Sequence, residues 1–260
     1  MPVVGASPES LRAFVLANTV VSAPPLLPEL PLHLVTEVMP LWSSTEKYLA
    51  GSGIEPPFWA FAWPGGQAVA RYLLDRPEVV RGLRVLDFAT GSGLIALAAA
   101  LAGAADVVAI DCDPLAIAAT ALNAERLGLR IDARLGDALE PGEFSSALAS
   151  FDVVTAGDIC FDGVWAARAI GWLRQRAAAG ALVLLGDPGR TYLPTGGLDE
   201  LARFWVETVA DVDRAPTMMS TVHRLCADAD EPSSRVDGTE PFSDPPKRTF
   251  TGEDRWPKGK

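Results

Sequence analysis

The clearest candidate for chemistry is a glycine-rich segment at residues 85–93, VLDFATGSG. An apolar run typical of a strand leads into it, and a run typical of a helix follows. Gly91 and Gly93 let the backbone approach a ligand closely, and the helix start presents N–H groups to a carboxylate or phosphate. Dinucleotide binders use the same device, and a tight turn without any ligand is a further alternative.

Asp87 lies inside the expected strand, four residues before Gly91. A carboxylate there is atypical of dinucleotide sites, although Ala96 satisfies the third small position of their fingerprint. We expect Asp87 either to order the glycine-rich loop or to meet an ammonium group of the ligand, directly or through water.

Two more aspartates follow expected strands. Asp111 ends the next apolar run, where an acidic side chain can accept both hydroxyls of a ribose. Asp137 follows the third run, where a carboxylate can receive the amino group of adenine. Each alone has an ordinary explanation as a turn former, but open α/β sheets bind ligands at the carboxyl ends of successive strands. A ligand with an amino acid end, a ribose and an adenine is S-adenosylmethionine.

The elements that must position these residues alternate short apolar runs with helical runs, which predicts a parallel sheet with crossover helices. Strands are expected at 84–89, 107–111, 131–135, 151–156 and 181–186, and helices at 93–102, 114–127, 162–177 and 198–204. Two later β-like runs, 205–213 and 218–226, predict an antiparallel hairpin that closes one edge of the sheet.

The N-terminal region predicts a helix followed by an irregular arm. Ser7 and Pro8 are a helix start, and the helix should run to about Asn18. Prolines at 24, 25, 28 and 31 exclude a regular helix or a central strand, so this segment should wrap over the core as a strap. A second short helix is expected at 46–49, before an aromatic cluster at 58–63.

Composition narrows the classes of partner. The 260 residues include 33 acidic and 22 basic side chains, for a net charge of −11, and 49% are hydrophobic. Lys and Arg do not cluster, so a nucleic-acid partner is not expected. The negative charge favours a cationic substrate or partner, although solubility alone also accounts for it.

Cysteines and histidines are few and scattered. Three cysteines and two histidines show no disulfide framework and no metal-ligand spacing, so no metal is expected. No secretory signal, transit peptide or apolar run long enough to cross a bilayer is apparent. We expect a cytoplasmic protein without a membrane partner.

Five segments of the sequence carry a resemblance to known proteins. The glycine-rich segment resembles class I, seven-stranded S-adenosylmethionine-dependent methyltransferases. The segments 57–67 (PFWAFAWPGGQ), 71–74 (RYLL), 151–158 (FDVVTAGD) and 186–190 (GDPGR) more specifically resemble the lysine methyltransferases of the electron transfer flavoprotein β subunit. The resemblance spans about residues 7–226. It implies a Rossmann-like α/β fold, with helices on both faces of a seven-stranded sheet and an N-terminal helical and extended arm.

The domain organisation follows from this resemblance and from the tail. Residues 1–66 are expected to form the N-terminal helix and the proline-rich, aromatic arm, which packs on the core. Residues 67–227 are expected to form the methyltransferase domain. Residues 228–260 contain fourteen charged residues and five prolines, and they are expected to be disordered.

The acceptor side of the site is expected around Asp158. A lysine amine must lose a proton before it can be methylated, so a carboxylate should orient it while desolvation lowers its pKa. Asp158 begins a D-x-x-F/Y pattern of these lysine methyltransferases, with Phe161 as an aromatic wall for the lysine stem. Relatives often have tyrosine there, so Phe161 lacks one hydroxyl hydrogen bond.

Three more residues are expected near the site. Trp63 is expected against the donor or its adenine, with core packing as the alternative. For Trp59 and Phe61, core packing is weighed equally with a place in the site. Asp187 and Arg190 follow the fifth strand as substrate-binding candidates. Arg190 would contact the substrate protein or Asp187, and a solvated surface arginine is the alternative.

The sequence thus predicts an S-adenosylmethionine-dependent lysine N-methyltransferase. Its partner would be a protein with an accessible lysine, and the resemblance points to the β subunit of electron transfer flavoprotein. A small-molecule N-methyltransferase of the nicotinamide type is the first alternative. A donor-binding module without transferase activity is the second.

Overall fold

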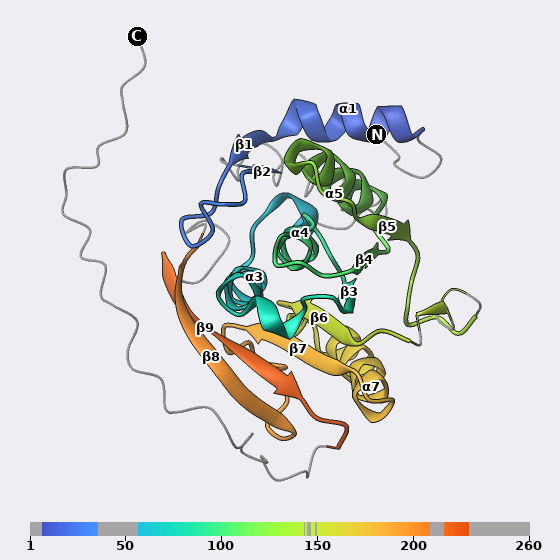
Figure 1. Ribbon diagram of the computed structural model, residues 1–260, viewed down its shortest axis with the longest axis vertical. Helices are drawn as coiled ribbons and strands as arrows, with labels where there is room; N and C mark the ends of the chain where they lie inside the picture. Colours follow the sequence, from blue (N-terminus) through green and yellow to red (C-terminus); the bar gives the residue numbers. More distant parts are fainter. Residues whose placement is uncertain are drawn as a thin grey trace, which may run out of the picture.

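A computed structural model describes residues 7–35, 57–208 except 143, 145, 146 and 149, and 216–228. The helix expected at 46–49 and the tail beyond Asp228 lie outside these residues. Within them, one seven-stranded sheet carries helices on both of its faces (Figure 1). No helix among them is long and apolar enough to cross a bilayer.

The sheet has a reversal in strand order at its centre. Its strands are β3 (Arg84–Phe88), β4 (Asp106–Asp111), β5 (Asp132–Leu135), β6 (Val153–Gly157), β7 (Leu182–Asp187), β8 (Leu198–Glu207) and β9 (Thr217–Leu225), in the order β5-β4-β3-β6-β7-β9-β8. Strands β3 to β7 are parallel, and β9 is antiparallel to both of its neighbours. The order reverses between β3 and β6, which is where open α/β sheets bind ligands. The predicted fold class is confirmed.

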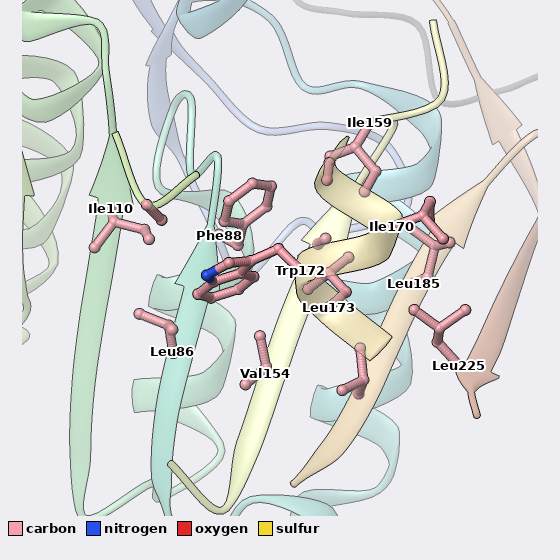
Figure 2. Close-up of a cluster of buried hydrophobic side chains, with 14 of the residues drawn as sticks. Leu86, Phe88, Ile110, Val154, Ile159, Ile170, Trp172, Leu173, Leu185 and Leu225 are labelled. Atoms are coloured by element: carbon pink, nitrogen blue, oxygen red, sulfur yellow. The ribbon is translucent and has the colours of Figure 1, made fainter. Parts of the chain in front are cut away.

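The helices form a layer on each face of this sheet. Helices α3 (Pro64–Asp75), α4 (Leu94–Leu101) and α5 (Pro114–Leu127) cover one face, and α7 (Gly163–Ala178) packs on the other (Figure 1). The strands are apolar on both sides because both faces are buried: Val107 packs with α3 and α4, and Val108 packs with α7. Figure 2 shows the α7 side of the core, with Trp172 against Phe88.

The predicted helix at 198–204 is wrong, because these residues begin β8. Strand β8 pairs with β9 over its whole length, and its register shifts between Glu200 and Ala202. This irregularity inserts one residue and breaks the alternation of inward and outward side chains. The resulting spacing of Leu198, Leu201 and Ala202 imitates one face of a helix, and Leu, Glu, Ala and Arg are good helix formers. The antiparallel hairpin itself is confirmed.

The N-terminal arm packs over the helices as a strap. Helix α1 (Pro8–Asn18) is capped by Ser7, as predicted, and lies along α5 (Figure 1). Strands β1 (Val20–Ser22) and β2 (Leu32–Leu34) then pair with each other. The proline-rich turns between them bury Leu27 and Leu30 completely against α4 and α5. Two short 3-10 turns, η1 (Phe58–Ala60) and η2 (Pro77–Val79), flank α3.

Candidate functional site

The carboxyl ends of the five parallel strands bring the predicted site residues to one edge of the sheet. The glycine-rich loop follows β3, and an aspartate stands at or just after the end of each of the next four strands: Asp111, Asp137, Asp158 and Asp187. The edge therefore collects one backbone loop and four carboxylates around the switch point between β3 and β6.

Asp87 lies beneath the glycine-rich loop and has no exposed surface. Its carboxylate accepts hydrogen bonds from the Thr90 hydroxyl at 2.6 Å, the Thr155 hydroxyl at 2.9 Å and the Ala96 N–H at 3.2 Å. Burial raises its pKa to about 6, against the lowering effect of these bonds. Of the two roles predicted for Asp87, its position favours ordering the loop.

Helix α5 clamps the glycine-rich loop from one side. Gly91 and Gly93 both have positive φ angles, 55° and 83°, and a Cβ on Gly93 would lie 3.0 Å from the Thr120 side chain. Asn123, which is fully buried, donates from Nδ2 to the Ser92 carbonyl at 2.8 Å. Its Oδ1 accepts the His33 N–H of β2 at 2.7 Å. Asn123 thus ties the loop to the N-terminal strap.

Sequence reasoning missed this role of Asn123. The available signal was an asparagine within a mostly apolar helical run. A buried amide at such a position needs hydrogen-bond partners outside its own helix.

Asn123→Ala is expected to loosen both the strap and the loop. It leaves the Ser92 carbonyl and the His33 N–H without their partner, at a cost of about 2–4 kcal/mol in unfolding free energy. The affinity for S-adenosylmethionine should fall about tenfold in a calorimetric titration. Asn18→Ala is the matched control, because Asn18 only donates to a carbonyl at the exposed end of α1. Equal effects of the two variants would contradict this prediction.

Asp111 and Asp137 stand at the ends of β4 and β5. Asp111 accepts the Gly91 N–H at 3.0 Å on one oxygen and the Asp113 N–H at 3.0 Å on the other. Burial raises its pKa. Asp137 is exposed and accepts the Leu139 N–H at 2.8 Å. Each carboxylate oxygen can accept a second bond, so both side chains retain acceptor capacity for a ligand.

The start of α3 makes a backbone joint with the ends of β6 and β7. A Cβ on Gly65 would collide with the carbonyl oxygen of Gly186, and a Cβ on Gly157 would lie 2.7 Å from Gly66. This joint lets the Gly66 N–H reach Asp158 Oδ2 at 2.9 Å. The Pro-Gly-Gly string therefore places a helix start directly against the predicted acceptor carboxylate.

Gly65→Ala should disrupt this joint. The colliding atom belongs to the sheet backbone and cannot move aside as a side-chain end could, so we expect a loss of about 3 kcal/mol in unfolding free energy. Gly171→Ala in α7 is the control: nothing lies within 4 Å of its Cβ, so it should stabilise the protein by up to about 1 kcal/mol. Chemical denaturation measures both changes, and a neutral Gly65→Ala would contradict the joint.

Asp158 is buried, strained and paired with a cation. Its φ angle is +58°, a left-handed conformation that costs a residue other than glycine about 1–3 kcal/mol and that is common in functional sites. Its Oδ1 accepts Arg190 Nη2 at 2.8 Å, and only 6% of its side chain is exposed. Burial raises the pKa of Asp158, and Arg190 opposes that rise.

Asp187 holds the turn that presents Arg190. Its Oδ1 accepts the N–H groups of Gly189 at 2.7 Å and Arg190 at 2.6 Å. The side chain has no exposed surface, and its Oδ2 has no hydrogen-bond partner among the described residues. Its position therefore does not support the predicted direct contact with a substrate. Arg190 uses its guanidinium for Asp158 and its backbone for Asp187.

Asp187 should make stability depend on pH. Burial raises its pKa to about 6, well above the ordinary value of an aspartate, so the folded state holds the proton more tightly than the unfolded state does. Stability from this group is present at low pH and is lost as pH rises through about 6. Between about pH 4.5 and 7.5, the unfolding free energy of the wild type should fall, and in Asp187→Asn this fall should be smaller by about 2 kcal/mol. Asp132→Asn, at an exposed ion pair, is the control. An unchanged fall would contradict the prediction.

Aromatic side chains line the edge beside Asp158. Phe161 is 48% exposed and lies between Phe58, at 5.2 Å, and Trp165, at 5.4 Å between ring centroids. Trp63 donates to the Phe58 carbonyl at 2.8 Å, and its ring faces Arg190 at 5.7 Å. Trp63 therefore lies on the Asp158 side of the edge, and Trp59 is core packing, as is Phe61.

Comparisons with known proteins agree with this geometry. A family model described as ribosomal protein L11 methyltransferase (PrmA) matches residues 72–158. The chain is 38% identical over 186 residues to the electron transfer flavoprotein beta subunit lysine methyltransferase of Danio rerio, covering 71% of this chain and 69% of that protein. The Xenopus laevis protein of the same name is 39% identical over 184 residues, covering 69% and 70%. The Homo sapiens protein is 38% identical over 182 residues, covering 69% and 67%.

Proposed function

The chain belongs to the family of electron transfer flavoprotein beta subunit lysine methyltransferases, and we propose that its own substrate is a lysine of that flavoprotein subunit. The protein is an S-adenosylmethionine-dependent methyltransferase that methylates protein lysine. The observation that carries the proposed substrate is this family relationship, which spans most of the chain.

The methyl-donor side of the sheet edge, formed by the glycine-rich loop, Asp111 and Asp137, fits S-adenosylmethionine. Helix α4 begins directly after Gly93. Because glycine has no side chain that could cap the first N–H groups of the helix, these groups can bind a carboxylate. Asp111 retains an acceptor position for a ribose, and exposed Asp137 retains one for an adenine amino group. Within the described residues, no cluster of three or more His, Cys, Asp or Glu side chains could hold a metal.

The acceptor side would orient and shield the lysine. When bound, S-adenosylmethionine supplies a methyl group on a sulfonium centre, and the protein must align the amine with it and exclude water. Asp158 would accept a hydrogen bond from the amine and set its direction. The half-exposed ring of Phe161 would pack against the aliphatic lysine stem. A low-polarity wall also favours the neutral amine, which is the reactive form.

Intact mass spectrometry tests this proposal directly. Purified protein is incubated with S-adenosylmethionine and the flavoprotein β subunit, and mass increments of one or more methyl groups are expected on the subunit alone. A parallel reaction without the donor is the control. With a labelled donor in a lysate, label in small amines instead of protein would contradict the proposal. A cytoplasmic location stays a prediction of the sequence.

A further inference from the structure

Arg190 is the charged neighbour of Asp158 in the acceptor site. Its guanidinium is enclosed between the Asp158 carboxylate, at 2.8 Å, and the face of Trp63, at 5.7 Å from the ring centroid. Only 22% of its side chain is exposed, so solvent screens the pair much less than it screens a surface pair. A buried carboxylate without such a partner would carry a large desolvation cost.

The loop after β7 fixes this guanidinium from behind. Asp187, at the end of β7, receives the backbone N–H of Arg190, and Gly189 makes the turn with a φ angle of +85°. The backbone of Arg190 is thus bonded to Asp187, and its side chain reaches Asp158. Neither of these two hydrogen bonds of Arg190 involves a residue of the methyl-donor side of the edge.

On the basis of the proposed function, we propose that Arg190 is a positioning residue for methyl transfer. Its guanidinium compensates the buried charge of Asp158 and holds one carboxylate oxygen, so that the remaining acceptor positions are aimed at the lysine amine. The Gly66 N–H holds the other oxygen at 2.9 Å. A carboxylate has about four acceptor positions, so the bonds from Arg190 and from the N–H groups of Gly65 and Gly66 still leave one for an amine.

The charged groups that face Asp158 agree with this role. Burial raises the pKa of Asp158, and the guanidinium and the N–H groups of Gly65 and Gly66 lower it. Burial and the charge of Asp158 raise the pKa of Asp187, and burial and the charges of both aspartates raise the pKa of the Cys160 thiol. Arg190 is the cation that offsets both carboxylates. Without it, the pKa of Asp158 would rise further, and a larger fraction of its carboxyl group would be protonated and unable to present a full negative charge to the amine.

Arg190→Met is the test variant, because it removes the charge and keeps a long side chain. The ratio of its kcat/KM to that of the wild type should be about one tenth at pH 7 and should rise as the pH is increased, because Asp158 then loses its proton in the variant as well. Taking the ratio cancels the titration of the lysine itself. Arg190→Lys should restore most of the activity, and the donor affinity should stay within about threefold of wild type, since Arg190 lies on the acceptor side.

A stability measurement provides a readout that does not depend on activity. Arg190→Met should destabilise the wild-type protein at pH 7.5 but have much less effect in an Asp158→Asn background, as a double-mutant cycle would show. Arg168→Met is the matched control, because Arg168 pairs with Glu140 on the exposed surface of α7.

The outcomes separate this inference from the proposed function. If Asp158→Asn stops methylation while Arg190→Met has wild-type kcat/KM at every pH, the role of Arg190 is overturned and the proposed function stands. A pH-independent loss in Arg190→Met, or no coupling in the cycle, also overturns it. If Asp158→Asn retains full turnover, the proposed role of Asp158 fails first.

Discussion

Asp158→Asn is expected to lower the rate of lysine methylation by about 10²–10⁴-fold, the usual range for removing a positioned proton acceptor. The substitution keeps the side-chain volume and an oxygen for the Gly66 N–H, but it removes the negative charge. The amine would then lose the acceptor that orients it, and the amide would present its NH₂ group to Arg190. Single-turnover kinetics with the flavoprotein subunit would measure the loss.

Donor binding separates this effect from a general loss of structure. The affinity of Asp158→Asn for S-adenosylmethionine should stay within about threefold of wild type, because Asp158 lies on the acceptor side of the edge. Asp132→Asn, at an exposed ion pair with Arg134, should leave both rate and affinity unchanged. An Asp158→Asn protein with full turnover would remove this residue from the reaction.

Asp87→Ala is expected to abolish measurable donor binding, with at least about a hundredfold loss of affinity. It removes the acceptor of three buried donors: the hydroxyls of Thr90 and Thr155 and the N–H of Ala96. These donors hold the turn between β3 and α4, so the loop would lose its shape. Isothermal calorimetry measures the affinity, and circular dichroism checks that the sheet has formed.

Asp87→Asn distinguishes the two roles that the sequence left open. An asparagine fits the same three partners, because its amide can donate to the Thr155 hydroxyl while its oxygen accepts from Thr90 and Ala96. If Asp87 orders the loop, this variant should keep its affinity within about tenfold of wild type. A loss as large as that of Asp87→Ala would instead show that the charge meets the donor. Unchanged calorimetry for Asp87→Ala would refute the donor site.

The sheet and its ligand edge were predictable because they follow from local patterns. Short apolar runs that alternate with helical runs indicate the five parallel strands. The aspartates that follow these strands indicate the edge of the sheet where a ligand is expected. Asp113 and Asp162 are of a residue type favoured at helix starts, and their side chains cap α5 and α7. Each of these signals depends on neighbours in the chain and needs no knowledge of distant contacts.

The features that the sequence did not predict depend on pairing across the fold. Strand β8 reads as a helix because the register shift between Glu200 and Ala202 exists only when β9 pairs with it. The Arg190–Asp158 ion pair joins residues 32 apart, and Asn123 joins α5 to β2 and to the glycine-rich loop. No local period encodes these contacts.

The glycine joint between α3 and the ends of β6 and β7 limits which residues of this enzyme can be substituted. Gly65, Gly157 and Gly186 meet through backbone atoms, so no change in a neighbouring side chain can make room for a larger residue there. Val164 and Tyr192, by contrast, project outward from α7 and from the loop after β7. Substitutions at such outer residues can therefore accumulate without moving the backbone, while the joint keeps the Asp158 carboxylate in the same place.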